Sequence, residues 1–391
     1  MPTTSAPSRL SLSQLAPGVF QSEIRAMSVA CDAIGGINLA QGVCDTPVPA
    51  VVEAEALAAI HAGHNIYTRL DGIARLRNAI SAKQKKDYGL SYNPDGEVLV
   101  SSGATGGFHA AAVALLNPGD EVLYHEPCYV SYSPSIALAR GKAIPVTTRA
   151  EDEFVLRAAD LEKAVTPRTR LLMLSFPTNP TGAVMPPDEL AKIAAFAVKH
   201  DLVVLTDEIY SELTYDDLPH HSIAALPGMK ERTLFLHGFS KAFAMTGWRI
   251  GFACGPNDII EAMMKIHQYS IMCASTMAQE AAIEALERGQ RSMEQMREEY
   301  RQRRNFIVSS LNDAGIPCHL PKGAFYVFPD IRSTGLSSKE FSLALLKEKN
   351  VAVVPGTAFG ASGEGYVRCS YAAALDQIKI AVERIAEFVR N

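Results

Sequence analysis

Long apolar segments are missing from this sequence. No run reaches the ~18 consecutive apolar residues that a transmembrane helix needs. The first ten residues are polar and lack the apolar middle of a signal peptide. We therefore expect a cytoplasmic protein with no membrane partner. The net charge of −5 also argues against a nucleic acid as the main partner, because a polyanion is bound by a basic surface.

Paired cysteines and nucleotide-binding motifs are also missing. The seven cysteines are odd in number, scattered, and never spaced as Cys-x-x-Cys. This pattern is typical of reduced thiols and indicates neither a disulfide framework nor a zinc site. There is no Gly-x-Gly-x-x-Gly fingerprint and no Walker lysine after a glycine loop. We expect no bound metal.

The chain is longer than one hydrophobic core usually organises, which predicts two domains in its 391 residues. Short apolar runs alternate with helical patterns between about residues 96 and 256. Some runs are wholly apolar, as in 171–174, which is typical of strands buried on both faces of a parallel sheet. The predicted strands are 97–101, 121–125, 143–147, 171–176, 202–206, 233–237 and 250–254. A helix is predicted at 187–200, where the pair Pro186-Pro187 is a typical start signal.

The pattern changes after about residue 290. A long charged helix is predicted at 292–311, followed by strands near 324–328, 351–354 and 366–370 and helices near 338–349 and 374–389. An amphipathic helix within 15–34 could pack against this part. The fold class we expect is α/β: a large domain with a mainly parallel seven-stranded sheet flanked by helices, plus a smaller α+β domain. The large domain is predicted to span 46–290, and the small domain 1–45 with 291–391.

Unusual residues follow five of the predicted strands. Ligands of open α/β sheets lie beyond the carboxyl ends of the strands, so these segments should meet at one edge. The segments are Ser102–Gly107, Glu126–Tyr129, Pro177–Gly182, Asp207–Tyr210 and Gly238–Lys241. The glycine cluster opens a helix, where free backbone N–H groups favour a phosphate, although a plain turn would have the same composition.

Five charged or polar residues are candidates for binding a ligand, and each also has a plain structural explanation. Lys241 could be a desolvated amine that forms an imine, or a surface lysine. Arg249, which enters a buried strand, could bind a phosphate or a structural carboxylate. Asp207 ends an apolar strand and could pair with a protonated ring nitrogen or an arginine. Arg368 could bind a ligand carboxylate or pair with the other domain, and Asn179 could simply build a turn.

Two motifs resemble those of the class I/II aminotransferase family of fold-type I pyridoxal-5'-phosphate (PLP) enzymes, the aspartate aminotransferase-like group. They are Asn179–Gly182 and Ser240–Gly251, and the resemblance extends over nearly the whole chain, from Asn38 to Arg368. It implies a PLP-dependent aminotransferase that transfers the amino group of an L-amino acid, such as aspartate or an aromatic one, to a 2-oxo acid such as 2-oxoglutarate.

The resemblance also implies roles for individual residues. Lys241 would hold PLP as a Schiff base and act as the base at the substrate Cα. Asp207 would pair with the pyridinium nitrogen, Tyr210 and Asn179 would hydrogen-bond the phenolic oxygen, and Tyr129 would stack on the ring. The remaining cofactor ligands would be Gly103, Ala104, Thr105, Ser240 and Arg249, mostly at the phosphate. Arg368 would bind the substrate carboxylate, with Gly42, Asn179 and Phe325 around the substrate.

Tyr67 would reach the phosphate of a neighbouring subunit, which implies a homodimer with shared active sites.

Three positions bear on how the phosphate and an acidic substrate would be bound. Many relatives have a phosphate-binding serine where Gly238 stands, so Ser240 or backbone N–H groups would have to substitute. Some relatives that favour acidic substrates have a lysine where Thr105 stands. Arg69 could meet a second carboxylate or be an exposed loop residue.

Two other functions remain open from the sequence. A C–S β-lyase or another PLP reaction would share the lysine, the aspartate and the carboxylate-binding arginine. A PLP-binding transcriptional regulator would need an attached DNA-binding module, for which the chain has no room before the proposed catalytic domain. Dependence of the reaction on an amino acceptor separates transfer from elimination.

Overall fold

The computed structural model describes residue 15 and residues 21–390. Its largest sheet has seven strands in the order β2-β8-β7-β6-β5-β3-β4. Strand β8 runs in the direction opposite to the other six strands. The prediction of a mainly parallel seven-stranded sheet is therefore confirmed. The strands are β2 Val98–Ser101, β3 Glu121–Glu126, β4 Lys142–Thr147, β5 Thr169–Ser175, β6 Val203–Asp207, β7 Thr233–Gly238 and β8 Gly251–Cys254, each within two residues of the predicted bounds.

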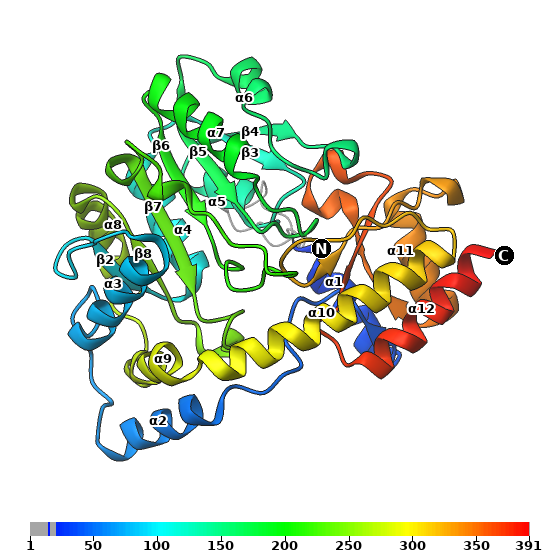
Figure 1. Ribbon diagram of the computed structural model, residues 1–391, viewed down its shortest axis with the longest axis horizontal. Helices are drawn as coiled ribbons and strands as arrows, with labels where there is room; N and C mark the ends of the chain where they lie inside the picture. The colour runs from blue at the N-terminus through cyan, green and yellow to red at the C-terminus, as the bar shows by residue number, and fades with distance from the viewer. Residues whose placement is uncertain (1–14, 16–20, 391) are drawn as a thin grey trace, which may run out of the picture.

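Helices cover both faces of this sheet (Figure 1). Alternate residues of β5 enter different hydrophobic clusters: Leu171 packs with side chains of α4 and α8, whereas Leu172 packs with side chains of α7. This burial on both faces explains the continuous apolar run in the sequence. The helices of this part are α2 Ala50–His61, α3 Ala74–Tyr88, α4 Gly103–Leu115, α5 Tyr132–Leu138, α6 Ala158–Ala164, α7 Pro187–Lys199, α8 Asn257–Ser270 and α9 Thr276–Arg288.

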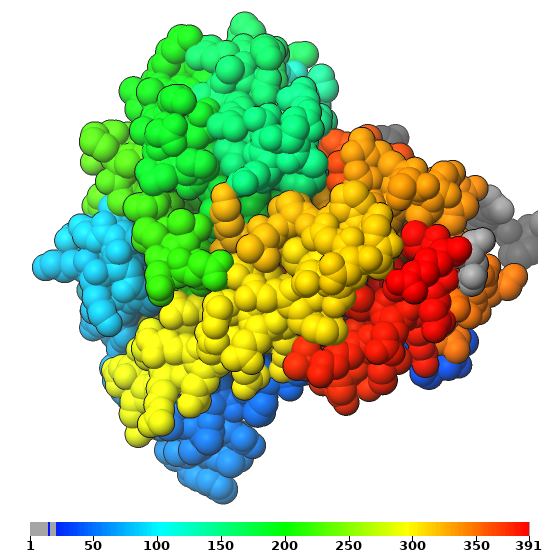
Figure 2. Space-filling model, turned by 45° about the vertical axis from the view of Figure 1, so that its right-hand side comes forward, coloured from blue at the N-terminus to red at the C-terminus, as the bar shows by residue number. Residues whose placement is uncertain are grey.

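The smaller part of the molecule contains two small sheets and three long helices. Strands β11, β12 and β9 form an antiparallel sheet, and β1 pairs with β10 in parallel although more than 300 residues separate them. The strands are β1 Ile37–Asn38, β9 Tyr326–Val327, β10 Val351–Ala352, β11 Val354–Pro355 and β12 Val367–Ser370, and the helices are α10 Gln290–Asp313, α11 Ser338–Lys349 and α12 Leu375–Arg390. Helix α10 runs from the large part into the small one (Figures 1 and 2).

The predicted N-terminal helix is shorter than the sequence pattern suggested. Helix α1 spans Glu23–Ala33 and packs against β1, β10 and β11, as expected. Residues 16–20 of the predicted helix lie outside the described residues. The domain division at residues 46 and 291 stays a prediction.

Absences expected from the sequence can be examined only over the residues that the structure describes. Within 21–390, no helix combines the length and apolarity of a membrane span. In the same part of the chain, no cluster of His, Cys, Asp and Glu side chains could hold a metal ion. All seven cysteines are free thiols.

Candidate active site

A cavity of about 220 Å³ opens at the carboxyl edge of the large sheet, where the small part faces it. Its walls come from segments far apart in the chain. Of the residues singled out in the sequence, it is lined by Gly42, Ala104, Thr105, Tyr129, Asn179, Asp207, Tyr210, Ser240, Lys241, Arg249 and Arg368. The topology thus brings together the segments that follow β2, β3, β5, β6 and β7, because parallel strands end at the same edge.

Lys241 follows β7 and projects its amine into the cavity. Its Nζ donates a hydrogen bond to the Gly42 carbonyl oxygen at 2.9 Å and forms no ion pair with a described carboxylate. Burial lowers the pKa of Lys241 to about 8; the thiol of Cys44 opposes this shift, and the positive charges of Arg368 and Arg249 add to it. The amine is therefore much closer to its neutral, nucleophilic form at neutral pH than an ordinary lysine.

Asp207 is the last residue of β6 and is buried. Its Oδ2 accepts a hydrogen bond from the Tyr132 hydroxyl at 2.8 Å, and Oδ1 accepts one from the Ile209 N–H at 3.2 Å. Burial raises the pKa of this carboxyl, and the Tyr132 hydrogen bond opposes that shift. None of the described lysines, arginines or histidines forms an ion pair with it, so its charge faces the cavity without a cation.

A glycine-lined corner lies where α4 begins. Gly103 has a φ of +67°, and a Cβ added there would lie 2.5 Å from Nη2 of Arg249. Gly251 is equally crowded, because its added Cβ would lie 2.7 Å from the Ala104 backbone nitrogen. Arg249 donates to the Thr246 carbonyl oxygen and pairs with no described carboxylate. A helix N-terminus and an unpaired guanidinium at one corner form a site for an anion.

Arg368 is only 1% exposed, yet it has no carboxylate partner among the described residues. It donates from Nη1 to Asn179 Oδ1 at 2.9 Å and from Nη2 to the Ala40 carbonyl oxygen, while its Nε has no described partner. The guanidinium lies 4.3 Å from the centre of the Tyr326 ring. A buried, incompletely satisfied arginine beside a cavity is suited to bind an anionic ligand.

Three predicted site residues do not line the cavity. Gly103 lies beside it, against Arg249. Phe325 is fully buried behind it, with its ring centre 5.3 Å from Lys241 Nζ. Tyr67 is 79% exposed on a loop away from the cavity of its own chain. Arg69, near Tyr67, forms a two-point pair with Asp71 at 3.0 and 2.8 Å.

Gly238 lies at the end of β7, where a side chain would be crowded. An added Cβ would come within 3.2 Å of Ile209 Cδ1 and of the Ile250 carbonyl oxygen. Ser240, two residues on, does line the cavity. The local packing therefore accounts for glycine at this position and offers Ser240 as the nearby hydroxyl.

Sequence reasoning assigned no role to six residues that line the cavity: Ile24, Tyr132, Ser175, Ile209, Thr246 and Tyr326. Tyr326 is adjacent to the predicted Phe325, and its hydroxyl lies 2.9 Å from the Tyr210 hydroxyl. Tyr132 lies three residues after Tyr129, which is the spacing of one helical turn and the one signal that pointed to it. Ile24 and Ser175 carried no such signal.

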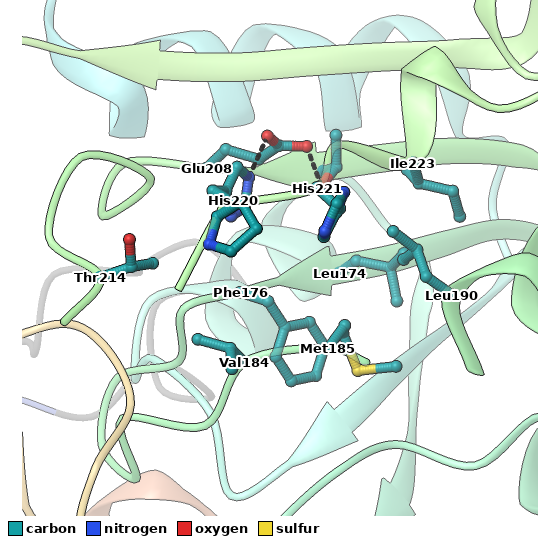
Figure 3. Close-up of a pocket in the computed structure, with 12 residues that line it drawn as sticks. Leu174, Phe176, Val184, Met185, Leu190, Glu208, Thr214, His220, His221 and Ile223 are labelled. Carbon is teal, nitrogen blue, oxygen red and sulfur yellow. Dashed lines mark hydrogen bonds and ion pairs between the residues drawn. The ribbon is translucent and has the colours of Figure 1, made fainter. Parts of the chain in front are cut away.

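A second cavity, of about 20 Å³, is large enough for roughly one water molecule. Figure 3 shows that it is bounded by apolar side chains, including Phe176 and Met185, and by the polar pair Glu208–His220. Glu208 Oε2 lies 2.6 Å from His220 Nε2, and Oε1 accepts from Ser222 at 2.7 Å. This satisfied network anchors the residue after Asp207 and has a structural role.

Comparison with known proteins identifies the family. The profile described as aminotransferase class I and II matches residues 34–385. The chain belongs to the class I and II aminotransferase family. It is 45% identical to the aspartate aminotransferase of Pyrococcus abyssi, over 95% of this chain and 97% of the relative. It is 43% identical to the aromatic-amino-acid aminotransferase 2 of Thermococcus litoralis, over 98% and 99% of the two chains.

Solved structures of this family share the fold. The aspartate aminotransferase of Thermus thermophilus with maleate superposes with a TM-score of 0.93 at 36% identity, covering 96% of this chain and 99% of that one. The aromatic aminotransferase of Pyrococcus horikoshii gives 0.90 at 45% identity, covering 93% and 98%. The protein is therefore a PLP-dependent aminotransferase, and its substrates are amino acids and 2-oxo acids. The relatives are named as aminotransferases, which favours transfer over elimination.

Proposed function

We propose that this aminotransferase binds PLP in the 220 Å³ cavity, with Lys241 as the residue that carries it covalently. The observation that carries the proposal is a set of side chains around one cavity that have no ion-pair partner among the described residues. They are an amine with a lowered pKa, a carboxylate without a cation, and two arginines without carboxylates. PLP has a carbonyl carbon, a basic ring nitrogen and a phosphate, and the substrate adds a carboxylate. Each charge in the cavity thus has a complementary group in cofactor or substrate.

The phosphate would lie at the N-terminus of α4. Gly103 lets the chain enter the helix with a positive φ, and Ala104 and Thr105 offer first-turn N–H groups. Arg249 would supply the positive charge, and Ser240 the hydroxyl that Gly238 lacks.

The ring would lie between Tyr129 and the sheet edge. Asp207 would pair with the ring nitrogen and keep it protonated. The phenolic oxygen would accept hydrogen bonds from Tyr210 and Asn179; the Asn179 amide Oδ1 already accepts from Arg368, which leaves its NH₂ group to donate. Phe325 would support the amine of Lys241 from behind, and Gly42 would hold it through the carbonyl hydrogen bond.

When bound, PLP supplies an electron sink for the electron pair left at the substrate Cα. The chain supplies everything else. Arg368 binds the substrate carboxylate and so orients the Cα–H bond. Once the substrate amine has taken its place on the cofactor, Lys241 Nζ, with its lowered pKa, would take the proton from the substrate Cα and deliver it to the cofactor carbon that bore the carbonyl oxygen. Asp207 holds a negative charge beside the ring nitrogen throughout.

For the substrates, we propose an L-amino acid donor of the aspartate or aromatic type and 2-oxoglutarate or a similar acceptor. One relative is named for aspartate and another for aromatic amino acids, and the two match the chain about equally well. This supports a donor of either type. Position 105 is a threonine and not the lysine of some relatives that favour acidic substrates, and Arg69 is paired with Asp71. The side-chain carboxylate of an acidic substrate therefore has no dedicated cation among the described residues of one chain.

We further propose that the enzyme is a cytoplasmic homodimer. Ile66, Tyr67 and Tyr269 are 78%, 79% and 87% exposed, and the Thr276 hydroxyl donates to the Ile66 carbonyl oxygen, which holds the exposed Ile66–Tyr67 segment against the start of α9. Such an apolar surface favours a partner subunit. Tyr67 would then reach the phosphate in the site of the partner subunit. Seven free cysteines suit a reducing compartment.

The test is borohydride reduction of the PLP-loaded enzyme, followed by peptide mapping and turnover assays with and without a 2-oxo acid. We expect the label on Lys241, and loss of label and turnover in Lys241→Ala. Lys265→Ala, an exposed helix lysine, is the matched control and should behave as wild type. Label on another lysine would refute the assignment, and pyruvate and ammonia formed without any acceptor would indicate elimination.

A further inference from the structure

Tyr132 contacts the proposed ring-nitrogen partner and has no role in the mechanism above. It lies at the start of α5, is 3% exposed and lines the cavity. Its hydroxyl is 2.8 Å from Asp207 Oδ2 and 3.0 Å from Ser175 Oγ. Among the described residues, Tyr132 is the one side chain that hydrogen-bonds the Asp207 carboxylate.

The direction of these hydrogen bonds follows from the number of protons. An ionised carboxylate only accepts, so the single hydroxyl proton of Tyr132 must go to Asp207. Ser175 Oγ must then donate to the Tyr132 oxygen. The result is a relay from Ser175 to Tyr132 to Asp207, whose hydrogen bonds are strongest when Asp207 is ionised.

The Tyr132 ring is fixed by packing. It lies 5.1 Å from the Phe108 ring and 5.6 Å, edge to face, from the Tyr129 ring. Phe108 belongs to α4, whose N-terminus forms the proposed phosphate corner, and Tyr129 is the proposed stacking residue. The hydroxyl is thus held at Asp207 by the same elements that would hold the cofactor.

Other charges around Asp207 do not replace this contact. His237 on β7 lowers the pKa of Asp207 and the adjacent Glu208 raises it, while burial remains the largest influence. Lys241 also lies near enough to interact with Asp207. None of these groups donates a hydrogen bond to the carboxylate in the described structure, whereas Tyr132 does so in a buried site, where charge-assisted bonds are strongest.

We propose that Tyr132 is a positioning residue, which holds the Asp207 carboxylate ionised and aimed at the ring nitrogen of PLP. This inference rests on the proposed role of Asp207. Without the hydroxyl, the buried carboxylate loses the one side-chain donor that the described residues give it. The ionised form then becomes less favourable, and the ring nitrogen loses its proton at a lower pH.

The experiment uses enzyme loaded with PLP that carries ¹⁵N in the ring, and follows the ring-nitrogen chemical shift as a function of pH. In the wild type we expect a protonated ring nitrogen across the neutral range. In Tyr132→Phe the transition to the unprotonated form should move to lower pH, and the Kd of PLP should rise by roughly tenfold or more, as for loss of a hydrogen bond to a charged group. Ser175→Ala, which removes only the donor to Tyr132, should shift both quantities in the same direction by less.

Tyr124→Phe is the matched control. Tyr124 is also a buried tyrosine whose hydroxyl donates to a carboxylate, Glu126, but it does not line the cavity. This variant should leave the nitrogen titration and the Kd unchanged. A Tyr132→Phe enzyme with a wild-type nitrogen titration and a Kd within twofold would overturn the inference. If Asp207→Asn also left the ring nitrogen protonated, the proposed role of Asp207 itself would fail.

Discussion

At the scale of single residues, the site is characterised by charges that the described chain does not neutralise. Lys241, Asp207 and Arg368 are each buried or nearly so, and none forms an ion pair with an oppositely charged side chain in the described structure. Burial of an unpaired charge costs stability, so a fold retains it where a ligand supplies the partner. The three charged groups therefore favour binding of cofactor and substrate, and they lower the stability of the PLP-free enzyme.

The first prediction concerns the amine of Lys241. Its pKa is lowered from 10.5 to about 8, mainly by burial, and only the neutral amine attacks a carbonyl. Below pH 8 the rate at which PLP-free enzyme captures PLP should rise about tenfold per pH unit, and above pH 8 it should level off. The rate of appearance of the cofactor absorbance is divided by that for Nα-acetyl-lysine with the same PLP, which cancels the ionisation of PLP. This ratio should be constant below pH 8 and fall about tenfold per pH unit between pH 8 and pH 10, where only the free lysine still gains neutral amine. A ratio that stayed constant from pH 6 to pH 10 would contradict the lowered pKa.

The residues that line the site were predicted well where they belong to a sequence motif, and less well where only side-chain packing determines which residue faces the cavity. Lys241, Asp207, Asn179 and Arg249 all line the cavity, because they follow strand ends or belong to the two motifs. Phe325 was chosen as the pocket wall, but the adjacent Tyr326 faces the cavity. Strand β9 has only two residues, so no alternation existed in the sequence to say which neighbour points inward.

At the scale of elements, the sequence predicted the seven strands of the large sheet, because strands buried on both faces are apolar throughout and are followed by recognisable turns. It did not predict that β8 is antiparallel or that β1 pairs with β10. These pairings join segments far apart in the chain, and strand order and direction leave no trace in local periodicity.

The second prediction tests how closely β8 and α4 must approach. A Cβ at position 251 would lie 2.7 Å from the Ala104 nitrogen, so Gly251→Ala should push the first turn of α4 away from Arg249. We expect the Kd of PLP, and that of inorganic phosphate for PLP-free enzyme, to rise about tenfold, the effect of an overpacking strain of 1–3 kcal/mol. Isothermal titration calorimetry measures both.

Gly247→Ala is the control for this prediction. Gly247 lies in the same segment, has no atom within 4 Å of an added Cβ and has no positive φ. Its substitution should leave both Kd values unchanged. Equal effects of the two substitutions would mean that flexibility of the segment, and not the approach of β8 to α4, governs phosphate binding.

At the scale of the whole molecule, the site is assembled between two parts that α10 connects. Ala40, Gly42, Tyr326 and Arg368 come from the smaller part, while Lys241 and Asp207 come from the edge of the large sheet. Tyr67 belongs to neither wall in its own chain. A dimer in which Tyr67 crosses to the other subunit would give this exposed side chain a function.

The last prediction tests this crossing by mixing two inactive or impaired variants, Lys241→Ala and Tyr67→Ala. If Tyr67 acts in the other subunit, each mixed dimer contains one site with both defects and one site with none. Unfolding and refolding the variants together at equal amounts should then restore about a quarter of wild-type activity, since half of the dimers are mixed and each has one intact site. If Tyr67 acted within its own chain, every site would keep a defect and no activity would return. Replacing Tyr67→Ala by Tyr269→Ala, a change at another highly exposed tyrosine, controls for general effects of removing a surface aromatic ring. Each parent variant, refolded alone, gives the baseline against which the gain is measured.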